Sequence, residues 1–246
     1  MKKQKISFLI IALLFSFIMI PSLKVSAAVA PQVPTGLQFA EQSKNKFWFG
    51  WDVDTNIIYY GAYGYYGYEV VVSTTKGKVI KTVAKDSLNN QNDTNVIPDS
   101  ANNRLYVAVE NGKLSKQAFK VKVRAYVFDE SGNKLYSGYT AEKVIVPRAN
   151  VKSLKATSRS TGLIKWQKVK GAKSYSVYVS SNGGTKFKRQ ATVSGTSYTV
   201  KGMKLSKQYY VYVVANGVKV KKKKFNSTKP MFKKSNASTI EIYLRY

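Results

Sequence analysis

The chain contains no cysteine and no histidine among its 246 residues. Without cysteine there is no disulfide framework, no thiol nucleophile and no thiolate metal site. Without histidine, the commonest general base and the commonest metal ligand are also missing. We therefore expect no catalytic residue, no metal site and no cofactor, and we interpret the protein as a non-enzyme.

Acidic residues are scarce, especially in the second half of the chain. Lys and Arg number 41 against 12 Asp and Glu, which gives a net charge of +29. Residues 148–246 hold 23 of the basic residues and a single carboxylate, Glu241, whereas residues 29–147 hold 14 basic and 11 acidic residues. A surface this basic collects counterions, and a polyanion that displaces them gains free energy. The asymmetry predicts an anionic partner for the second half.

Two pairs of carboxylates are candidates for chemistry. Asp52 and Asp54 follow Trp51, and Asp129 and Glu130 precede a glycine. Neither pair is accompanied by a histidine, a metal-ligand spacing or a second acidic cluster. The second pair is typical of a turn.

The chain has one long apolar run, at its N-terminus. Three lysines within residues 2–5 precede the apolar residues 6–20, and a small-residue cleavage site follows at residues 25–27. This pattern predicts a signal peptide over residues 1–28, with an uncleaved anchor as the alternative. No later run approaches the roughly 18–20 apolar residues of a membrane-spanning helix. We expect a secreted, extracellular protein held at the cell wall by charge, and its features resemble those of exported Gram-positive bacterial proteins.

The remaining chain is rich in Val, Tyr and Thr, and short alternating runs are separated by turn residues. This pattern predicts an all-β protein with two tandem antiparallel β-sandwich domains, at residues 29–147 and 148–225. A basic tail with an extra strand follows at residues 226–246, either packed on its own sheet or donated to a neighbour. Residues 87–103 are expected to form a long loop. Strands in the second domain are expected at residues 151–156, 163–166, 175–179, 186–188, 197–200, 209–215 and 218–221.

Aromatic residues recur at characteristic places in residues 147–225. Trp166 lies in the second expected strand, Tyr175 opens the third, and Tyr209 follows Met203 before a Tyr-Val alternation. In these positions the segment resembles the fibronectin type III family, which is immunoglobulin-like in architecture. The resemblance implies that Tyr209 is a corner tyrosine, whose hydroxyl bonds to nearby backbone. The family hosts many unrelated binding roles, so the resemblance says little about function.

A second, more divergent copy of the same pattern precedes it. The matching segments are residues 34–37, Trp51, and residues 67–72, 119–125 and 144–146. Phe119 replaces the corner tyrosine there.

Strand alternation places charged and aromatic side chains together in the second domain. Tyr209, Val211 and Val213 are expected to face the core, which would turn Tyr210 and Tyr212 outward. With neighbouring strands of one sheet, this predicts a flat basic face carrying aromatic rings, suited to an anionic polymer. The alternative is that these are ordinary strand tyrosines and protective edge lysines. The expected polyanion-binding residues are Tyr178, Lys186, Lys188, Tyr210, Tyr212, Lys219, Lys221, Lys222, Lys223 and Lys224.

The four consecutive lysines at residues 221–224 form the strongest charge run. The alternation of inward and outward side chains fails there, because Lys222 or Lys224 would point into the core. We therefore expect the strand to fray into a solvated basic segment. Each lysine can neutralise one phosphate, which predicts strong salt dependence.

Residues 57–68 form a Tyr/Gly-rich segment between two expected strands. Such loops are typical of adaptable recognition surfaces for a protein or carbohydrate. Packing over Trp48 and Trp51 as a small additional core is an equal alternative. The recognition-loop residues are Tyr59, Tyr60, Tyr63, Tyr65 and Tyr66.

These features predict a non-catalytic binding or adhesion protein. The basic domain would bind cell-wall teichoic acid, extracellular DNA or a glycosaminoglycan, and the Tyr/Gly-rich segment a second partner. The alternative is a self-associating matrix or surface-fibre subunit, and a membrane-active effector is a third, disfavoured by the lack of an amphipathic helix.

Overall fold

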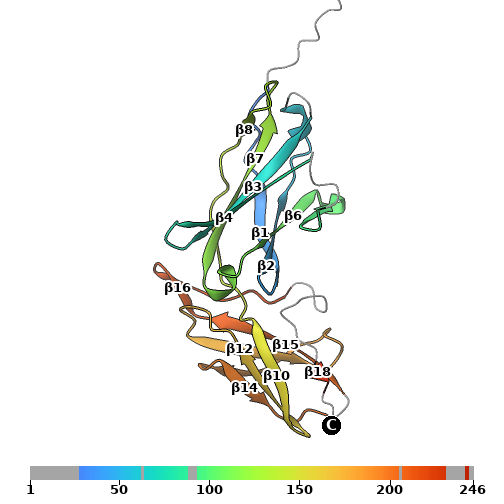
Figure 1. Ribbon diagram of the computed structural model, residues 1–246, viewed down its shortest axis with the longest axis vertical. Helices are drawn as coiled ribbons and strands as arrows, with labels where there is room; N and C mark the ends of the chain where they lie inside the picture. The colour runs from blue at the N-terminus through green and yellow to red at the C-terminus, as the bar shows by residue number, and fades with distance from the viewer. Residues whose placement is uncertain (1–27, 62–63, 88–92, 205–206, 231–241, 244–246) are drawn as a thin grey trace, which may run out of the picture.

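Two β-sandwiches follow one another along the chain in the computed structural model (Figure 1). The structure describes residues 28–61, 64–87, 93–204, 207–230 and 242–243. The expected signal peptide therefore lies outside the described residues, apart from its last position. Within the described part, no helix has the length and apolar character needed to cross a membrane.

The first sandwich packs a four-stranded sheet, β1-β2-β6-β5, against a five-stranded sheet, β4-β3-β7-β8, in which β9 also pairs with β7. All the pairings are antiparallel. Its strands are β1 (Thr35–Ser43), β2 (Lys46–Asp52), β3 (Tyr66–Thr74), β4 (Val79–Asp86), β5 (Val96–Asp99), β6 (Arg104–Glu110), β7 (Phe119–Phe128), β8 (Lys134–Tyr136) and β9 (Lys143–Ile145). Short 3-10 turns occupy η1 (Ile57–Tyr59), η2 (Ser100–Asn102) and η3 (Leu114–Lys116).

Aromatic side chains fill the first core because β2 and β7 alternate between the core and the outside. Phe119 packs edge-on against Phe47, with ring centroids 5.2 Å apart, and Trp51 packs against Tyr68 at 5.2 Å. All four side chains are buried. Phe119, which stands at the corner-tyrosine position, thus contributes a ring to the core without a hydroxyl. The expected long loop at residues 87–103 was wrong in part, because β5 and η2 lie within it.

The second sandwich has the sheets β10-β11-β14 and β13-β12-β15-β18, with a separate hairpin β16-β17. The all-β, antiparallel sandwich class predicted from the sequence is confirmed. Its strands are β10 (Val151–Ser158), β11 (Thr161–Trp166), β12 (Ser174–Ser180), β13 (Lys188–Val193), β14 (Ser197–Val200), β15 (Gln208–Asn216), β16 (Val218–Val220), β17 (Lys223–Phe225) and β18 (Ile242–Tyr243).

The fibronectin type III-like features of this sandwich are present in detail. Trp166 and Tyr175 are buried against one another, with centroids 5.6 Å apart. The Tyr209 hydroxyl accepts a hydrogen bond from the backbone N–H of Lys204 at 2.6 Å. The expected corner tyrosine is confirmed.

A buried junction joins the two sandwiches. The five residues 145–149 are all buried, and Ala149 donates its N–H to the Val213 carbonyl of β15 at 3.0 Å. Ala118 from the first half packs in the core of the second sandwich. Arg148, which is 1% exposed, forms an ion pair with Glu41 of β1 and donates to the Gln42 carbonyl at 2.7 Å. The sandwiches are therefore fixed to one another by polar contacts that are shielded from water.

Candidate polyanion-binding surface

The four-lysine run forms a tight hairpin. Lys221 and Lys222 make the turn between β16 and β17, and Lys221 has a left-handed φ of 52°. The expectation that the strand frays was therefore wrong: a two-residue turn reverses the chain, and β17 returns antiparallel to β16 with both of its lysines exposed. We call Lys219 and residues 221–224 the basic hairpin.

Like charges face each other across the basic hairpin. Lys219 pairs directly with Lys224, and Val220 with Lys223. All five lysines are exposed, and none has an ion pair with any described residue. Like charges directly opposite on paired strands destabilise the pairing by up to about 1 kcal/mol. An anion bound at the hairpin would remove that repulsion.

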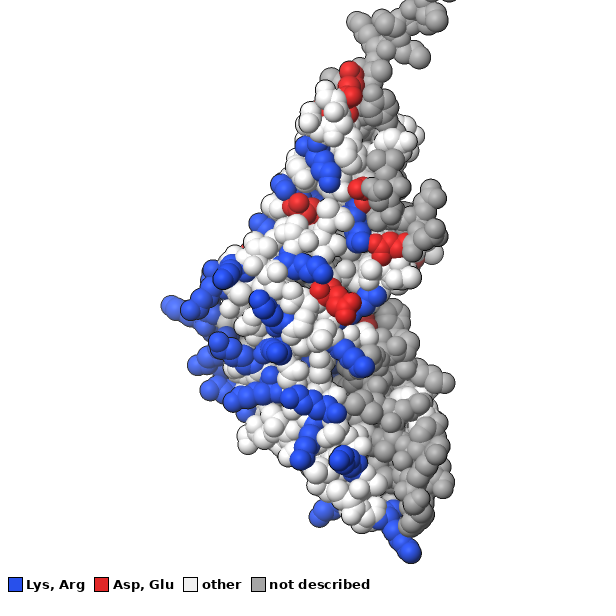
Figure 2. Space-filling model, viewed as in Figure 1, with Lys and Arg blue, Asp and Glu red and all other residues white. Residues whose placement is uncertain are grey.

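Basic residues gather at the level where the sandwiches meet. Figure 2 shows Lys and Arg side chains along the side of the molecule on which β16 lies in Figure 1. Lys186 and Lys188, beside β13, are also exposed. The sequence has no Asp or Glu from residue 148 to residue 230, so no local carboxylate offsets this charge.

The expected aromatic platform is wrong for two of its three tyrosines. Tyr210 and Tyr212 of β15 are 5% and 4% exposed, and Tyr178 of β12 is half-buried. On that face of the sheet, Tyr212 stacks on Tyr178 with centroids 4.7 Å apart and contacts the ring of Phe187 at 4.7 Å.

Two basic side chains from outside this sheet, Arg148 and Lys229, lie beside these rings. Lys229 places its ammonium 5.3 Å from the Tyr178 ring, and Arg148 lies close enough to Tyr212 to oppose the rise of that hydroxyl's pKa. Phe187 also belongs to this aromatic cluster, through its contact with Tyr212. Strand alternation assigns side chains to the two faces of a sheet, but it does not show which residues from elsewhere in the chain lie beside the second face.

Part of the tail pairs with its own molecule. Residues 242–243 form β18, which is antiparallel to residues 208–209 of β15. The rest of the expected extra strand lies outside the described residues.

A cation–aromatic ladder that was not predicted from the sequence lies on the outer face of the first sandwich. The Arg124 guanidinium lies 3.6 Å from the Tyr136 ring centroid and 4.7 Å from that of Tyr139. Glu69 accepts hydrogen bonds from Arg124 Nε at 2.8 Å and from the Tyr139 hydroxyl at 2.6 Å. The alternation of basic residues along β7 was the available signal. Since these groups already satisfy one another, the ladder serves stability.

The Tyr/Gly-rich segment divides into exposed and packed side chains. Tyr59 and Tyr65 are 76% and 42% exposed. Tyr60 and Tyr66 pack against the first core, as the alternative expectation had it, and Tyr63 lies outside the described residues. The register of β3 with β7 places this segment at the end of the first sandwich opposite the junction (Figure 1). Two exposed phenol rings therefore stand far from the basic hairpin.

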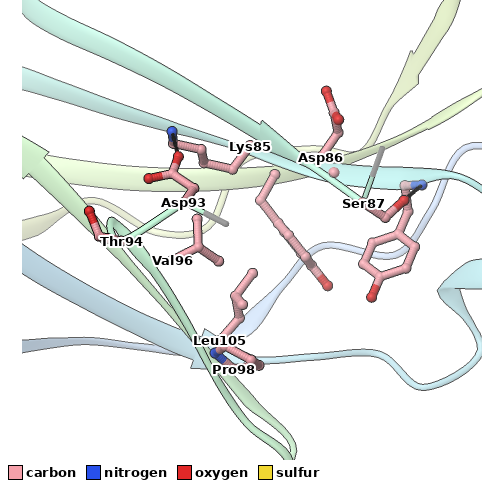
Figure 3. Close-up of a pocket in the computed structure, with 11 residues that line it drawn as sticks. Lys85, Asp86, Ser87, Asp93, Thr94, Val96, Pro98 and Leu105 are labelled. Atoms are coloured by element: carbon pink, nitrogen blue, oxygen red, sulfur yellow. Dashed lines mark hydrogen bonds and ion pairs between the residues drawn. The ribbon is translucent and has the colours of Figure 1, made fainter. Parts of the chain in front are cut away.

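A cleft of about 480 Å³ opens at one edge of the first sandwich, between β3–β4 and β5–β6 (Figure 3). Val96 and Leu105 form an apolar wall, and an ion pair between Lys85 and Asp93 lies at one end. The hydrogen bond from Lys85, together with one from the Asn95 N–H, lowers the pKa of Asp93 to about 2. An acid held ionised in this way cannot donate a proton near neutral pH.

The carboxylate pairs have structural partners. Asp52 forms an ion pair with Arg104 and accepts from the Thr35 hydroxyl at 3.1 Å. Asp129 accepts from the Asn133 N–H at 2.7 Å, which is the expected turn contact. Among the described residues, no three His, Cys, Asp or Glu side chains gather where they could hold a metal ion.

The comparisons with known proteins bear on the fold and give no information about an activity or a ligand. No protein-family model matches the chain. No curated protein matches it either. Among solved structures, the chicken CNTN1 FN1–FN3 domains are 17% identical over 89% of this chain and 69% of theirs, with a TM-score of 0.32. A two-domain fibronectin type III segment of chicken tenascin is 14% identical over 87% of this chain and 99% of its own, with a TM-score of 0.29. A protein described as FN3tt mut is 27% identical, but over only 27% of this chain and 71% of its own, with a TM-score of 0.24.

Proposed function

We propose that this protein is a secreted, non-catalytic binding or adhesion protein whose second sandwich attaches it to an anionic polymer. Cell-wall teichoic acid, extracellular DNA and glycosaminoglycans are the polymers that this charge suits. The basic hairpin is the main contact. Lys186 and Lys188 extend it.

The observation that carries this proposal is the hairpin's arrangement of charge. Five exposed ammonium groups lie within the six residues 219–224, without an acidic neighbour in sequence. Two of them face each other directly across the strands. Holding like charges together in this way destabilises the unbound protein, and a bound polyanion relieves the repulsion.

Recognition by the hairpin is electrostatic. Tyr210 and Tyr212 are buried, so stacking of bases or sugars on them plays no part. Lysine ammonium groups are point charges that bind phosphate or sulfate without reading a sequence. The attachment is therefore to a class of polymer, and salt weakens it.

The opposite end of the first sandwich supplies a second contact. The exposed rings of Tyr59 and Tyr65 present amphipathic surface of the kind found in adaptable binding loops. A protein or carbohydrate partner at this end would be held away from the polymer. To test this second contact, both tyrosines are replaced with serine and cell or matrix adhesion is measured. We expect adhesion to fall while polymer retention, the control, stays unchanged.

The direct test is retention of the full mature chain on immobilised heparin and on double-stranded DNA across a salt series. Replacing Lys221, Lys222, Lys223 and Lys224 with serine is expected to reduce the log-log salt slope on DNA by up to about 4, since each neutralised phosphate contributes about 0.9.

The matched control replaces four exposed lysines of the opposite sheet and its flank, Lys152, Lys155, Lys165 and Lys201, with serine. This control variant removes the same net charge, and we expect it to keep most of the log-log salt slope of retention on DNA. Equal losses in the two variants would show that the net charge, and not the hairpin, holds the polymer. Elution of the unmodified chain at low salt would overturn polymer binding altogether.

A further inference from the structure

A cleft of about 770 Å³ lies between the two sandwiches, beside the basic hairpin. The first sandwich lines it with Lys120 of β7 and residues 142–144 at β9. The second sandwich lines it with residues 220–223 and Phe225. We call this the junction cleft, and each sandwich supplies only one of its walls.

The junction cleft combines an apolar wall with cations. Val144 and Phe225 are both partly exposed, and the buried Val220 also lines the cleft. Its one carboxylate, Glu142, is paired with Lys120 at 2.5 Å. The Lys143 ammonium donates to the Leu37 carbonyl at 3.0 Å. Two of the five lining lysines are thus engaged by protein groups.

The side chains of the other three lining lysines, Lys221, Lys222 and Lys223, have no hydrogen bond or ion pair with another described residue. Their ammonium groups stand beside hydrocarbon surface that water also reaches. A ligand that covers the apolar wall would bury hydrocarbon area favourably. A ligand without charge would leave these cations poorly solvated, which costs free energy.

The cleft is held open before any ligand arrives. The buried contacts of Arg148 with β1 fix the two sandwiches relative to each other. The Ser227 hydroxyl donates to the Pro147 carbonyl at 2.7 Å, which ties the segment after β17 to the junction. A site whose walls are already in place loses less entropy on binding.

We propose that the junction cleft binds an amphiphilic anion: one phosphate or carboxylate group carried on an apolar chain or ring. The anionic group contacts the lysines of the hairpin turn, and the apolar body lies along Val144, Val220 and Phe225. This site goes beyond the proposed polymer binding, because it takes one ligand per molecule and requires the first sandwich. Either function can hold without the other.

Titration calorimetry on the full mature chain tests the proposal, with dodecyl phosphate below its micelle-forming concentration as the probe. We expect one ligand per chain. Inorganic phosphate, which lacks the apolar body, and dodecyl maltoside, which lacks the charge, are expected to bind at least about tenfold more weakly.

Two variants locate the site. The triple change Lys221→Ser, Lys222→Ser and Lys223→Ser is expected to weaken dodecyl phosphate binding at least about tenfold. Val144→Ser is expected to weaken dodecyl phosphate binding while leaving heparin retention unchanged, because that side chain lines the cleft and carries no charge. The matched control, Lys152→Ser, Lys155→Ser and Lys165→Ser, removes the same charge and is expected to stay within about twofold. Unchanged circular dichroism and unfolding midpoints show that the variants are folded.

Several outcomes overturn the inference. These are the absence of one-to-one binding, equal affinity for the neutral detergent, and equal losses in the triple variant and its control. If the protein is retained on heparin but does not bind dodecyl phosphate, only the cleft proposal is overturned. If both interactions are absent, the hairpin has neither role.

Discussion

Glu41 and Arg148 are joined by a buried ion pair across 107 residues of sequence. Arg148 is buried to 1% exposure and Glu41 to 2%, so water does not screen the pair. Burial lowers the pKa of Arg148, and the neighbouring Glu41 opposes that shift. An arginine remains charged under these conditions. The pair therefore fixes the first sandwich to the second through a full charge on each side.

Breaking this pair from one side should be costly. Glu41→Gln leaves the Arg148 charge buried without a carboxylate, and we expect a loss of about 3–5 kcal/mol in the free energy of unfolding. Urea unfolding followed by tryptophan fluorescence measures it. Glu142→Gln is the control, because the Lys120–Glu142 pair is partly exposed and should contribute less than about 1 kcal/mol. Similar losses in both variants would contradict the role of burial.

The corner tyrosine gives a second test. Tyr209→Phe keeps the ring and removes the hydroxyl that accepts from the Lys204 N–H. That N–H then loses a partner, so we expect a destabilisation of about 1–2 kcal/mol in denaturant unfolding. Tyr198→Phe, at a half-buried ring that packs against the same core, should change stability by less than about 0.5 kcal/mol. If Tyr209→Phe left the free energy of unfolding unchanged, the hydroxyl would not stabilise this corner.

Alkaline pH should unfold the protein through its buried phenols. Burial raises the pKa of Tyr212 to about 12, helped by the nearby Tyr178, and burial also raises the pKa of Tyr139 to about 12, helped by Glu69. The native state thus favours the neutral phenol. That stabilisation is complete below the unfolded-state pKa of about 10 and is lost as the pH rises to about 12.

Tyrosinate absorbance and urea unfolding across this range measure the effect. We expect exposed tyrosines to ionise first and a second group to ionise only as stability falls. Tyr212→Phe should reduce the alkaline loss. Ionisation of all tyrosines in one step near pH 10 with constant stability would contradict the burial of these rings.

The cation–aromatic ladder predicts the behaviour at acid pH. Burial raises the pKa of Glu69, but hydrogen bonds from Tyr139 and Arg124 outweigh this, and the net pKa is lowered. Stability from this carboxylate is present above its unfolded-state pKa and is lost as the pH falls through the native value. Arg124→Leu removes one of those bonds.

The difference in unfolding free energy between the unmodified chain and Arg124→Leu should therefore be largest near neutral pH and shrink on acidification. Urea unfolding between about pH 7 and pH 3 measures it. Lys122→Leu, which removes a cation over Tyr139 but no bond to Glu69, controls for loss of charge. A constant difference across this range would show that Arg124 acts through its packing alone.

Most strands of the second sandwich were predictable because their alternation is local, but the strand expected at residues 186–188 is instead β13 (Lys188–Val193). Trp166, Tyr175 and Tyr209 follow a spacing that encodes the sandwich, and each contacts neighbours close in sequence. The burial of Tyr212 was not predictable from strand alternation, because its neighbours Tyr178, Phe187 and Arg148 come from other parts of the chain. The ion pair between Glu41 and Arg148 was hidden for the same reason. Nothing in the local pattern around either residue shows that both become buried.

For the candidate site, the sequence indicated the excess of lysines but not the hairpin that they form. The run of lysines was evident, whereas its reversal at Lys221 depends on a left-handed backbone that alternation does not reveal. The junction cleft requires two walls from different sandwiches, and its position follows from the packing at residues 145–149.

The buried connection also determines where proteases can cut. Tandem domains are usually cleaved at an exposed, flexible linker, because a protease must draw an extended segment into its active site. Here residues 145–149 are buried, and Ala149 is hydrogen-bonded into the second sandwich. Cleavage between the sandwiches would first require them to separate. The molecule should therefore resist division into its halves in limited proteolysis, and the exposed ring of Tyr59 marks a more accessible point of attack.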